Sequence, residues 1–142
     1  MSSEMVSCKP DFDGRVAKWV CDGLGENTDW IGAGATLGVY FGEKLIAGII
    51  FNDIRPKCDV WLTIYSCDKR WCVRRVLRCV FNFCFTCLDC RRASAFVSVS
   101  NDKSRKLVER LGFRQEGVLR KYRDNGEDAF VFGMLKEECR WL

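Results

Sequence analysis

A strand, a helix, a second strand and a short helix follow one another between residues 59 and 113, and this order constrains the fold most strongly. The run Asp59–Ser66 is rich in β-branched and aromatic residues, which favours a strand, and the apolar spacing over Trp71–Cys90 predicts a long helix. Ala93–Ser100 is predicted as the second strand, and the short helix follows it from Asn101. Two strands joined by a helix are expected to lie parallel with a right-handed connection. The sequence therefore predicts an α/β fold built around one parallel pair.

Further elements are predicted before this crossover unit. Thr36–Phe41 and Leu45–Phe51 are apolar runs separated by a glycine-containing turn, which is typical of a β-hairpin. Pro56 excludes a central strand after the second run, because proline has no N–H to donate. With Asp59–Ser66, the two runs are predicted to form an antiparallel meander. Apolar residues at helical spacing also predict a helix within Lys9–Gly23, capped by an aspartate and ended by the glycines that follow.

A hairpin is predicted at the end of the chain. Val118–Arg123 and Ala129–Lys136 are the candidate strands, and Asn125-Gly126 lies between them. An Asn-Gly pair is the strongest short hairpin signal, since it supplies two residues with positive φ. No repeat or linker interrupts the sequence, so residues 1–142 are predicted to form a single domain.

Composition excludes several classes of protein. Of the 142 residues 48% are hydrophobic, which is enough for a core, and no stretch approaches the ~20 apolar residues of a membrane helix. The first residues lack the features of a signal peptide, so the expected location is the cytoplasm. Five of the ten cysteines fall in the predicted long helix, where reduced cysteine packs as a small apolar residue. There is no histidine and no second cysteine pair at zinc spacing, so no metal is expected.

Basic residues gather at the start of the long predicted helix. Positive charge is unfavourable at a helix N-terminus, so its concentration there favours a bound anion such as a phosphate. An ordinary solvated helix start is the alternative interpretation. The net charge of +4 is mild, which makes nucleic acid a less favoured partner. The candidate cradle consists of Lys69, Arg70, Trp71, Cys72, Val73 and Arg74.

The order of the elements and one motif resemble the GNAT superfamily of acyl-CoA-dependent N-acetyltransferases. The motif, Asn101-x-x-Ser104 followed by Leu111-Gly112-Phe113 and Glu116-Gly117, is similar to the N-x-x-S…L-G-F-x-x-E-G-x-x-R signature of the ribosomal-protein-type branch. The helix region up to Phe85 also resembles small phage-encoded members, which would place the protein in a host cytoplasm. The resemblance covers nearly the whole chain. It implies an α/β (α+β) fold with a mixed, mostly antiparallel sheet flanked by helices and one splayed parallel pair.

The resemblance also implies a reaction, in which an amine attacks acetyl-CoA directly in a ternary complex. The pyrophosphate of the cofactor would lie on the basic cradle, and the pantetheine arm against Tyr65 and Ser66 at the end of the first strand. Ser104 is the candidate proton donor to the leaving thiolate, with Asn101 as its orienting partner, and both are candidate cofactor contacts. The two residues also fit a plain helix cap. The candidate bases are Asp53, Asp59, Glu116 or a water chain.

One departure from the family pattern concerns the phosphate loop, where the two usual glycine positions fall on Lys69 and Trp71. This leaves open a degenerate member of the fold that acts through protein or nucleic-acid contacts without catalysis. The acceptor is equally open: a protein N-terminus, a lysine, a polyamine or an aminoglycoside-like amine. The acceptor groove is expected between the Asn27–Gly34 loop and the final hairpin. No membrane partner is expected, and a homodimer is one alternative for the oligomeric state.

Overall fold

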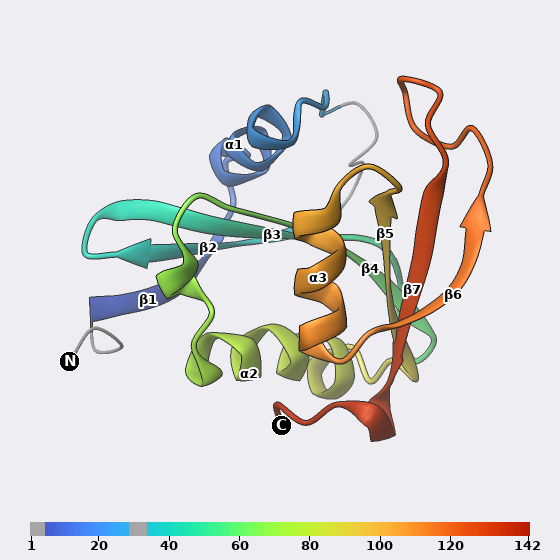
Figure 1. Ribbon diagram of the computed structural model, residues 1–142. Coiled ribbons are helices and arrows are strands. Elements are labelled where there is room, and N and C mark those ends of the chain that lie inside the picture. The colour runs from blue at the N-terminus through green and yellow to red at the C-terminus, as the bar shows by residue number, and fades with distance from the viewer. Residues whose placement is uncertain (1–4, 29–33) are drawn as a thin grey trace.

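A computed structural model describes residues 5–28 and 34–142 and contains a single sheet with helices on both of its faces (Figure 1). The strands of the described part follow the order β1-β2-β3-β4-β5-β7-β6, and every neighbouring pair is antiparallel except β4–β5. The predicted mixed, mostly antiparallel sheet is therefore confirmed. The strands are β1 (Val6–Asp11), β2 (Ala35–Phe41), β3 (Lys44–Arg55), β4 (Asp59–Ser66), β5 (Arg92–Ser98), β6 (Arg114–Leu119) and β7 (Ala129–Leu135). The helices are α1 (Arg15–Leu24), α2 (Arg74–Asn82) and α3 (Asp102–Leu111), with short helical turns at η2 (Lys69–Trp71), η3 (Phe83–Cys87) and η4 (Lys136–Glu138).

The parallel strands β4 and β5 pair only at their beginnings. Their ladder ends at the pair Trp61 and Ser94, while β4 continues to Ser66 and β5 to Ser98. Each strand keeps its other neighbour over the remaining length, β3 beside β4 and β7 beside β5. The predicted splay is thus confirmed, and the edge of β4 that faces β5 has no ladder beyond Trp61.

A polar network, here called the clamp, holds β4 and β5 together where they pair. The buried hydroxyl of Ser94 donates to Asp59 Oδ1 at 2.7 Å and accepts from Arg92 Nε at 3.0 Å. Arg92 Nη2 also lies 2.7 Å from Glu116 Oε1, which ties in strand β6. These bonds fix the point at which the two strands begin to diverge.

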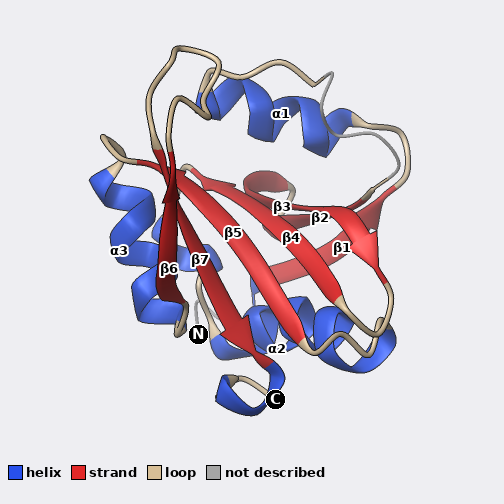
Figure 2. Ribbon diagram, turned by 90° about the vertical axis from the view of Figure 1, so that its right-hand side faces the viewer, coloured by secondary structure: helices blue, strands red, loops and turns tan. Residues whose placement is uncertain are grey.

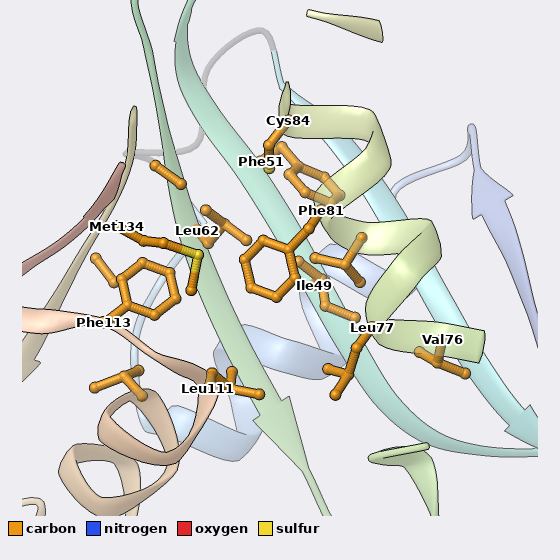
Figure 3. Close-up of a cluster of buried hydrophobic side chains, with 14 of the residues drawn as sticks. Ile49, Phe51, Leu62, Val76, Leu77, Phe81, Cys84, Leu111, Phe113 and Met134 are labelled. Atoms are coloured by element: carbon orange, nitrogen blue, oxygen red, sulfur yellow. The ribbon is translucent and has the colours of Figure 1, made fainter. Parts of the chain in front are cut away.

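The core is divided between the two faces of the sheet. Helices α2 and α3 cover one face and α1 the other (Figure 2). Neighbouring residues of β3 serve opposite faces, as expected for a strand: Ile49 packs toward α2 and Ile50 toward α1. Figure 3 shows Phe81 of α2 between side chains of the sheet and those near α3. A Cβ at Gly48 would lie 2.5 Å from Val20, so this glycine allows α1 to approach β3 closely.

The first part of the chain differs from the prediction of one helix within Lys9–Gly23. Residues Val6–Asp11 form strand β1 beside β2, and the helix begins only at Arg15. An aspartate cap was predicted, and two aspartates bond the first N–H groups: Asp13 Oδ1 accepts from Arg15 N at 3.2 Å and Asp11 Oδ2 from Val16 N at 3.3 Å. The prediction missed β1 because this edge strand has little apolar alternation of its own and is stabilised by pairing with β2.

The predicted helix Trp71–Cys90 was too long at both ends, since the helical segment stops at Cys87. The separate turn η2 comes first, and α2 begins at Arg74 and continues into η3. The separation of η2 from α2 accompanies the burial of Trp71, whose side chain is 2% exposed and packs in the core. An apolar period cannot distinguish such a buried turn from the first turn of the helix.

The closing hairpin is present, but its first strand lies earlier than predicted. Strand β6 ends at Leu119, so nine residues connect it to β7, rather than the five that the predicted strands would leave between them. Gly126 has a φ of 87° and Lys121 one of 53°, whereas Asn125 is not among the residues with positive φ. The loop is closed by Asp128, whose Oδ1 accepts from Lys121 N at 2.8 Å. The predicted pair of positive-φ residues was therefore wrong at Asn125, and the connection is longer than predicted because this carboxylate stabilises it.

Candidate functional site

The divergence of β4 and β5 opens a cavity of about 90 Å³, here called the central cavity. Its walls come from the unpaired halves of both strands and from the face of α3 that Ser104 and Leu107 occupy. Three larger cavities of the described part share lining residues with it: one at α3, one at the interruption of the β3–β4 ladder and one at the loop between β6 and β7. The first two are treated as the approaches to this small central space.

The first approach, here called the α3 cavity, has a volume of about 550 Å³. It lies between the end of β4, the turn η2 and helix α3, and it shares five lining residues with the central cavity, Ser104 among them. Most of the predicted cofactor residues are brought together here, whereas Arg70, Val73 and Arg74 are not among its lining residues. Those that line it are Tyr65, Ser66, Lys69, Trp71, Cys72, Asn101 and Ser104.

The side chain of Asn101 caps helix α3. Its Oδ1 accepts a hydrogen bond of 3.2 Å from Ser104 N, as expected for a favoured N-cap residue. This capping bond is therefore made to the backbone N–H of Ser104 and not to its hydroxyl group. The half-buried Ser104 lies at the boundary of the central and α3 cavities, next to the positive end of the helix dipole.

The donors of turn η2 are directed toward Asp68. Its carboxylate accepts from Arg70 N at 3.0 Å and lies 2.6 Å from Arg70 Nη2. The guanidinium of Arg70, followed by its backbone N–H, lowers the pKa of the Asp68 carboxyl to about 2. Arg70 also lies over the ring of Phe41, 3.9 Å from its centre. The carboxylate of Asp68 thus occupies the position in which a phosphate was predicted to meet this arginine.

The arginines at the start of α2 bind other parts of the chain. Arg74 Nη2 donates to Arg140 O at 3.1 Å, and the Arg74 guanidinium lies over the ring of Trp141. Arg75 Nη2 donates to Val6 O and so joins α2 to β1. The N-cap residue Val73 has no side-chain oxygen for the first turn of α2.

Two cations of the α3 cavity were missed by the sequence reasoning. Lys103 and Arg110 line it together with Lys69, so three positive side chains surround the space. Lys103 and Arg110 are seven residues apart, which is close to two helical turns, and this spacing places both on the face of α3 that carries Leu107. Arg110 acts on the neighbouring Cys72, whose pKa is raised by burial and lowered to a lesser degree by this guanidinium.

The second approach, here called the bulge cavity, has a volume of about 290 Å³. The ladder between β3 and β4 is interrupted after Asn52, and Asp53 adopts a φ of 49°. The rings of Phe96 and Tyr122 meet edge to face, with their centres 5.1 Å apart. The cavity is lined by Glu26, Asn52, Asp53, Phe96, Tyr122, Arg123 and Asp124. The sequence did not identify Glu26, Phe96, Tyr122 or Arg123 as site residues.

An ion pair between Glu26 and Arg123 lies at the boundary of the central and bulge cavities, because both residues line both spaces. The two side chains are 14% and 17% exposed, and the guanidinium lies 4.7 Å from the ring centre of Phe96. Burial lowers the pKa of Arg123. No feature of the sequence links these residues, since they are nearly a hundred positions apart.

The three candidate bases lie in different places. Asp53 lines the bulge cavity, whereas Asp59 and Glu116 belong to the clamp at the closed end of the strand pair. Within residues 5–28 and 34–142, no group of three or more histidine, cysteine or acidic residues could hold a metal ion. Over the same ranges no helix has the length and apolar character needed to cross a membrane. Most of the predicted Asn27–Gly34 acceptor loop lies outside the described residues.

Comparison with known proteins identifies the fold. No protein-family model and no curated protein matches the sequence. Among solved structures, a mutant of the spermidine N-acetyltransferase from Vibrio cholerae is 16% identical, with a TM-score of 0.74, and 98% of this chain and 97% of that chain are covered. The ribosomal-protein-S5-alanine acetyltransferase from Vibrio fischeri is 22% identical with a TM-score of 0.62, covering 75% of this chain and 64% of that one. The fold is therefore that of the GNAT acetyltransferases.

Proposed function

We propose that this protein is an N-acetyltransferase that moves the acetyl group of acetyl-CoA to a primary amine in a ternary complex. The observation that carries the proposal is the central cavity, which adjoins the larger α3 and bulge cavities. Direct transfer requires a place where two substrates meet end to end. Such alignment alone supplies several kcal/mol of the barrier, on the order of 7 in favourable cases.

The α3 cavity suits coenzyme A in both shape and charge. The edge of β4 beyond Trp61 is without a ladder, and the amide-containing pantetheine arm is able to pair with such an edge beside Tyr65 and Ser66. Three cations, Lys69, Lys103 and Arg110, stand where they would neutralise the cofactor phosphates. We assign the phosphate contacts to these three side chains, because the guanidinium of Arg70 is already paired with Asp68. Trp71 and Cys72 form walls of the cavity.

The reaction then uses groups at the central cavity. The amine nitrogen, once it has lost a proton, attacks the thioester carbon; the new C–N bond forms as the C–S bond breaks. The coenzyme leaves as a thiolate that must gain a proton. We assign that proton to the hydroxyl of Ser104, which Asn101 positions through the backbone of α3. The excess proton on the newly acylated nitrogen passes to the Ser104 oxygen, so that the amide, the thiol and the serine hydroxyl are all left neutral. Asp53 or a water chain through the bulge cavity receives the proton of the ammonium.

The finer assignments follow from the motif and the neighbours. The Asn101…Gly117 signature supports a place beside the ribosomal-protein-type branch and its small phage-encoded members. We propose that residues 1–142 act as one domain in the cytoplasm. A neighbour of 17% identity and TM-score 0.72, covering 94% of this chain and 95% of that one, is described as dodecameric, and this supports a multimer here as well.

Calorimetry with acetyl-CoA, followed by a transfer assay on a panel of amines, tests the proposal. We expect saturable cofactor binding and release of the free thiol that depends on the amine. Absence of binding at millimolar cofactor would overturn it. Binding without transfer to any amine would instead support the non-catalytic alternative.

A further inference from the structure

The side chain of Asn52 is buried at 2% exposure, and its amide oxygen has no hydrogen-bond donor among the described residues. The amide nitrogen donates to Asp53 Oδ2 at 3.2 Å, which fixes the orientation of the amide and identifies the oxygen as the unsatisfied atom. A buried acceptor without a partner lowers stability, so its presence calls for an explanation. Asn52 lines the bulge cavity, where a ligand that carries N–H groups would supply the missing donor.

The local backbone presents these two residues to the cavity. The pairing of β3 with β4 is regular up to Asn52 and Trp61 and resumes only at Arg55 and Asp59. Between these pairs Asp53 has a φ of 49°, a conformation that non-glycine residues rarely adopt. Bulges of this kind occur beside active sites, where they redirect side chains.

The remaining lining residues favour a cation. Three carboxylates, those of Glu26, Asp53 and Asp124, face one guanidinium, that of Arg123, so negative charge is in excess. Glu26 pairs with Arg123, which leaves the other two carboxylates as the surplus. The ring of Phe96 already meets the Arg123 guanidinium, and the neighbouring ring of Tyr122 adds a further aromatic surface, which attracts an ammonium group.

We propose that the bulge cavity binds the second, non-reacting ammonium of an aliphatic diamine, whose first amine reacts in the central cavity. Asn52 Oδ1 accepts a hydrogen bond from this ammonium, and Asp53 and Asp124 balance its charge, so that with a diamine the water chain rather than Asp53 receives the proton of the reacting amine. The proposal rests on the acetyltransferase function inferred above. It identifies the acceptor as a free di- or polyamine rather than a monoamine or a lysine side chain, which carries only one ammonium.

Competition between matched amines tests this assignment. The kcat/KM for acetyl transfer is measured for α,ω-diamines of three to six carbons, for n-alkylamines of the same lengths, and for Nα-acetyl-lysine amide. We expect the wild-type protein to prefer at least one diamine over its monoamine by about tenfold or more, which corresponds to about 1.4 kcal/mol. Equal rates for diamines and monoamines of every length, or a preference for the lysine derivative, would overturn the proposal.

Variants locate the preference. Asn52→Leu keeps the shape of the side chain and removes the acceptor, so the diamine preference is expected to fall by about tenfold. Asn82→Leu, an exposed position on α2 across the sheet, serves as the matched control and should keep the preference. Asp124→Asn, at an exposed position, provides a second test that does not depend on the folding of a core variant. An unchanged preference in both Asn52→Leu and Asp124→Asn would refute the assignment.

Direct binding separates this inference from the catalytic proposal. Calorimetry of the diamine with wild-type protein, Asn52→Leu and Asp124→Asn requires no cofactor. Diamine binding that both variants weaken, in a protein that acetylates nothing, would support the cavity assignment and refute the enzyme. Acetyl transfer without any diamine preference would support the enzyme and refute the cavity assignment.

Discussion

The amide of Asn101 binds a backbone N–H of α3, and this hydrogen bond determines where Ser104 lies. The motif that contains both residues was recognisable in the sequence, and so was capping as an alternative. The structure records the capping bond and also places Ser104 at the junction of two cavities. The ion pair of Glu26 with Arg123 could not be predicted in this way, because the two residues are distant in sequence and only the folded chain brings them together. The burial of the Asn52 amide likewise depends on the folded chain.

Replacing Ser104 tests its assigned role as proton donor. In Ser104→Ala the cap from Asn101 persists, since it uses the backbone, so the affinity for acetyl-CoA should remain within about twofold. Turnover should fall by roughly 10²-fold, the scale of a lost general acid. Steady-state kinetics and cofactor calorimetry measure the two effects, and Ser104→Thr should retain part of the turnover. Full turnover in the alanine variant would remove Ser104 from the mechanism.

The ion pair of Asp68 predicts a pH effect on stability. Because the folded pKa of about 2 lies below the ordinary 3.8, the pair contributes fully above pH 4 and its contribution is lost as the pH falls toward 2. We expect the free energy of unfolding to fall over this range less steeply in Asp68→Asn than in the wild type. Urea unfolding at several pH values compares the two, and parallel curves would contradict the prediction.

At the level of single elements, the spacing of side chains on α3 was more informative than the basic run before α2. The run was recognisable as a charge cluster, but its arginines meet Asp68, the carbonyl of Arg140 and that of Val6 within the protein. A sequence pattern gives the position of a charge along the chain and not the direction of its side chain. The helical spacing of Lys103 and Arg110, by contrast, places both side chains on the face of α3 that lines the cavity.

The cations of α3 are predicted to bind the cofactor phosphates. Lys103→Ala and Arg110→Ala should each raise the dissociation constant of acetyl-CoA about three- to thirtyfold, which is typical for one charge-assisted hydrogen bond. Lys106→Ala, on the same helix but not among the lining residues, is the matched control and should have little effect. The affinity should also decrease with salt. Equal effects at all three positions would indicate only general electrostatic attraction.

At the scale of the whole molecule, the crossover unit predicted the parallel pair and the order of the elements around it, whereas the splay of the pair was implied by the resemblance to the GNAT superfamily. Local periodicity was sufficient there because a helix between two strands permits few arrangements. It was insufficient for β1, whose stability comes from β2, and for the loop after β6, which Asp128 closes. The three cavities were likewise beyond prediction, since each is formed by side chains from several elements.

The clamp should matter for the stability of the whole sheet. Ser94→Ala removes a buried donor to Asp59 and an acceptor for Arg92, so we expect the free energy of unfolding to decrease by about 1–3 kcal/mol. Ser7→Ala, an exposed position on β1, is the control and should change it by less than about 0.5 kcal/mol. Urea denaturation measures both, and equal values would show that the clamp is not stabilising.

The unpaired edge of β4 has a thermodynamic consequence for the molecule as a whole. A ligand that pairs with this edge in the native chain, and has no such edge to bind in the unfolded chain, must raise the melting temperature as its concentration rises. At a hundred times its dissociation constant, the gain is about 2.7 kcal/mol. Heat resistance would then report how fully the protein is occupied by coenzyme A, whether acetylated or free, because both forms carry the pantetheine arm. In a cell, survival of the folded chain would follow the supply of this cofactor.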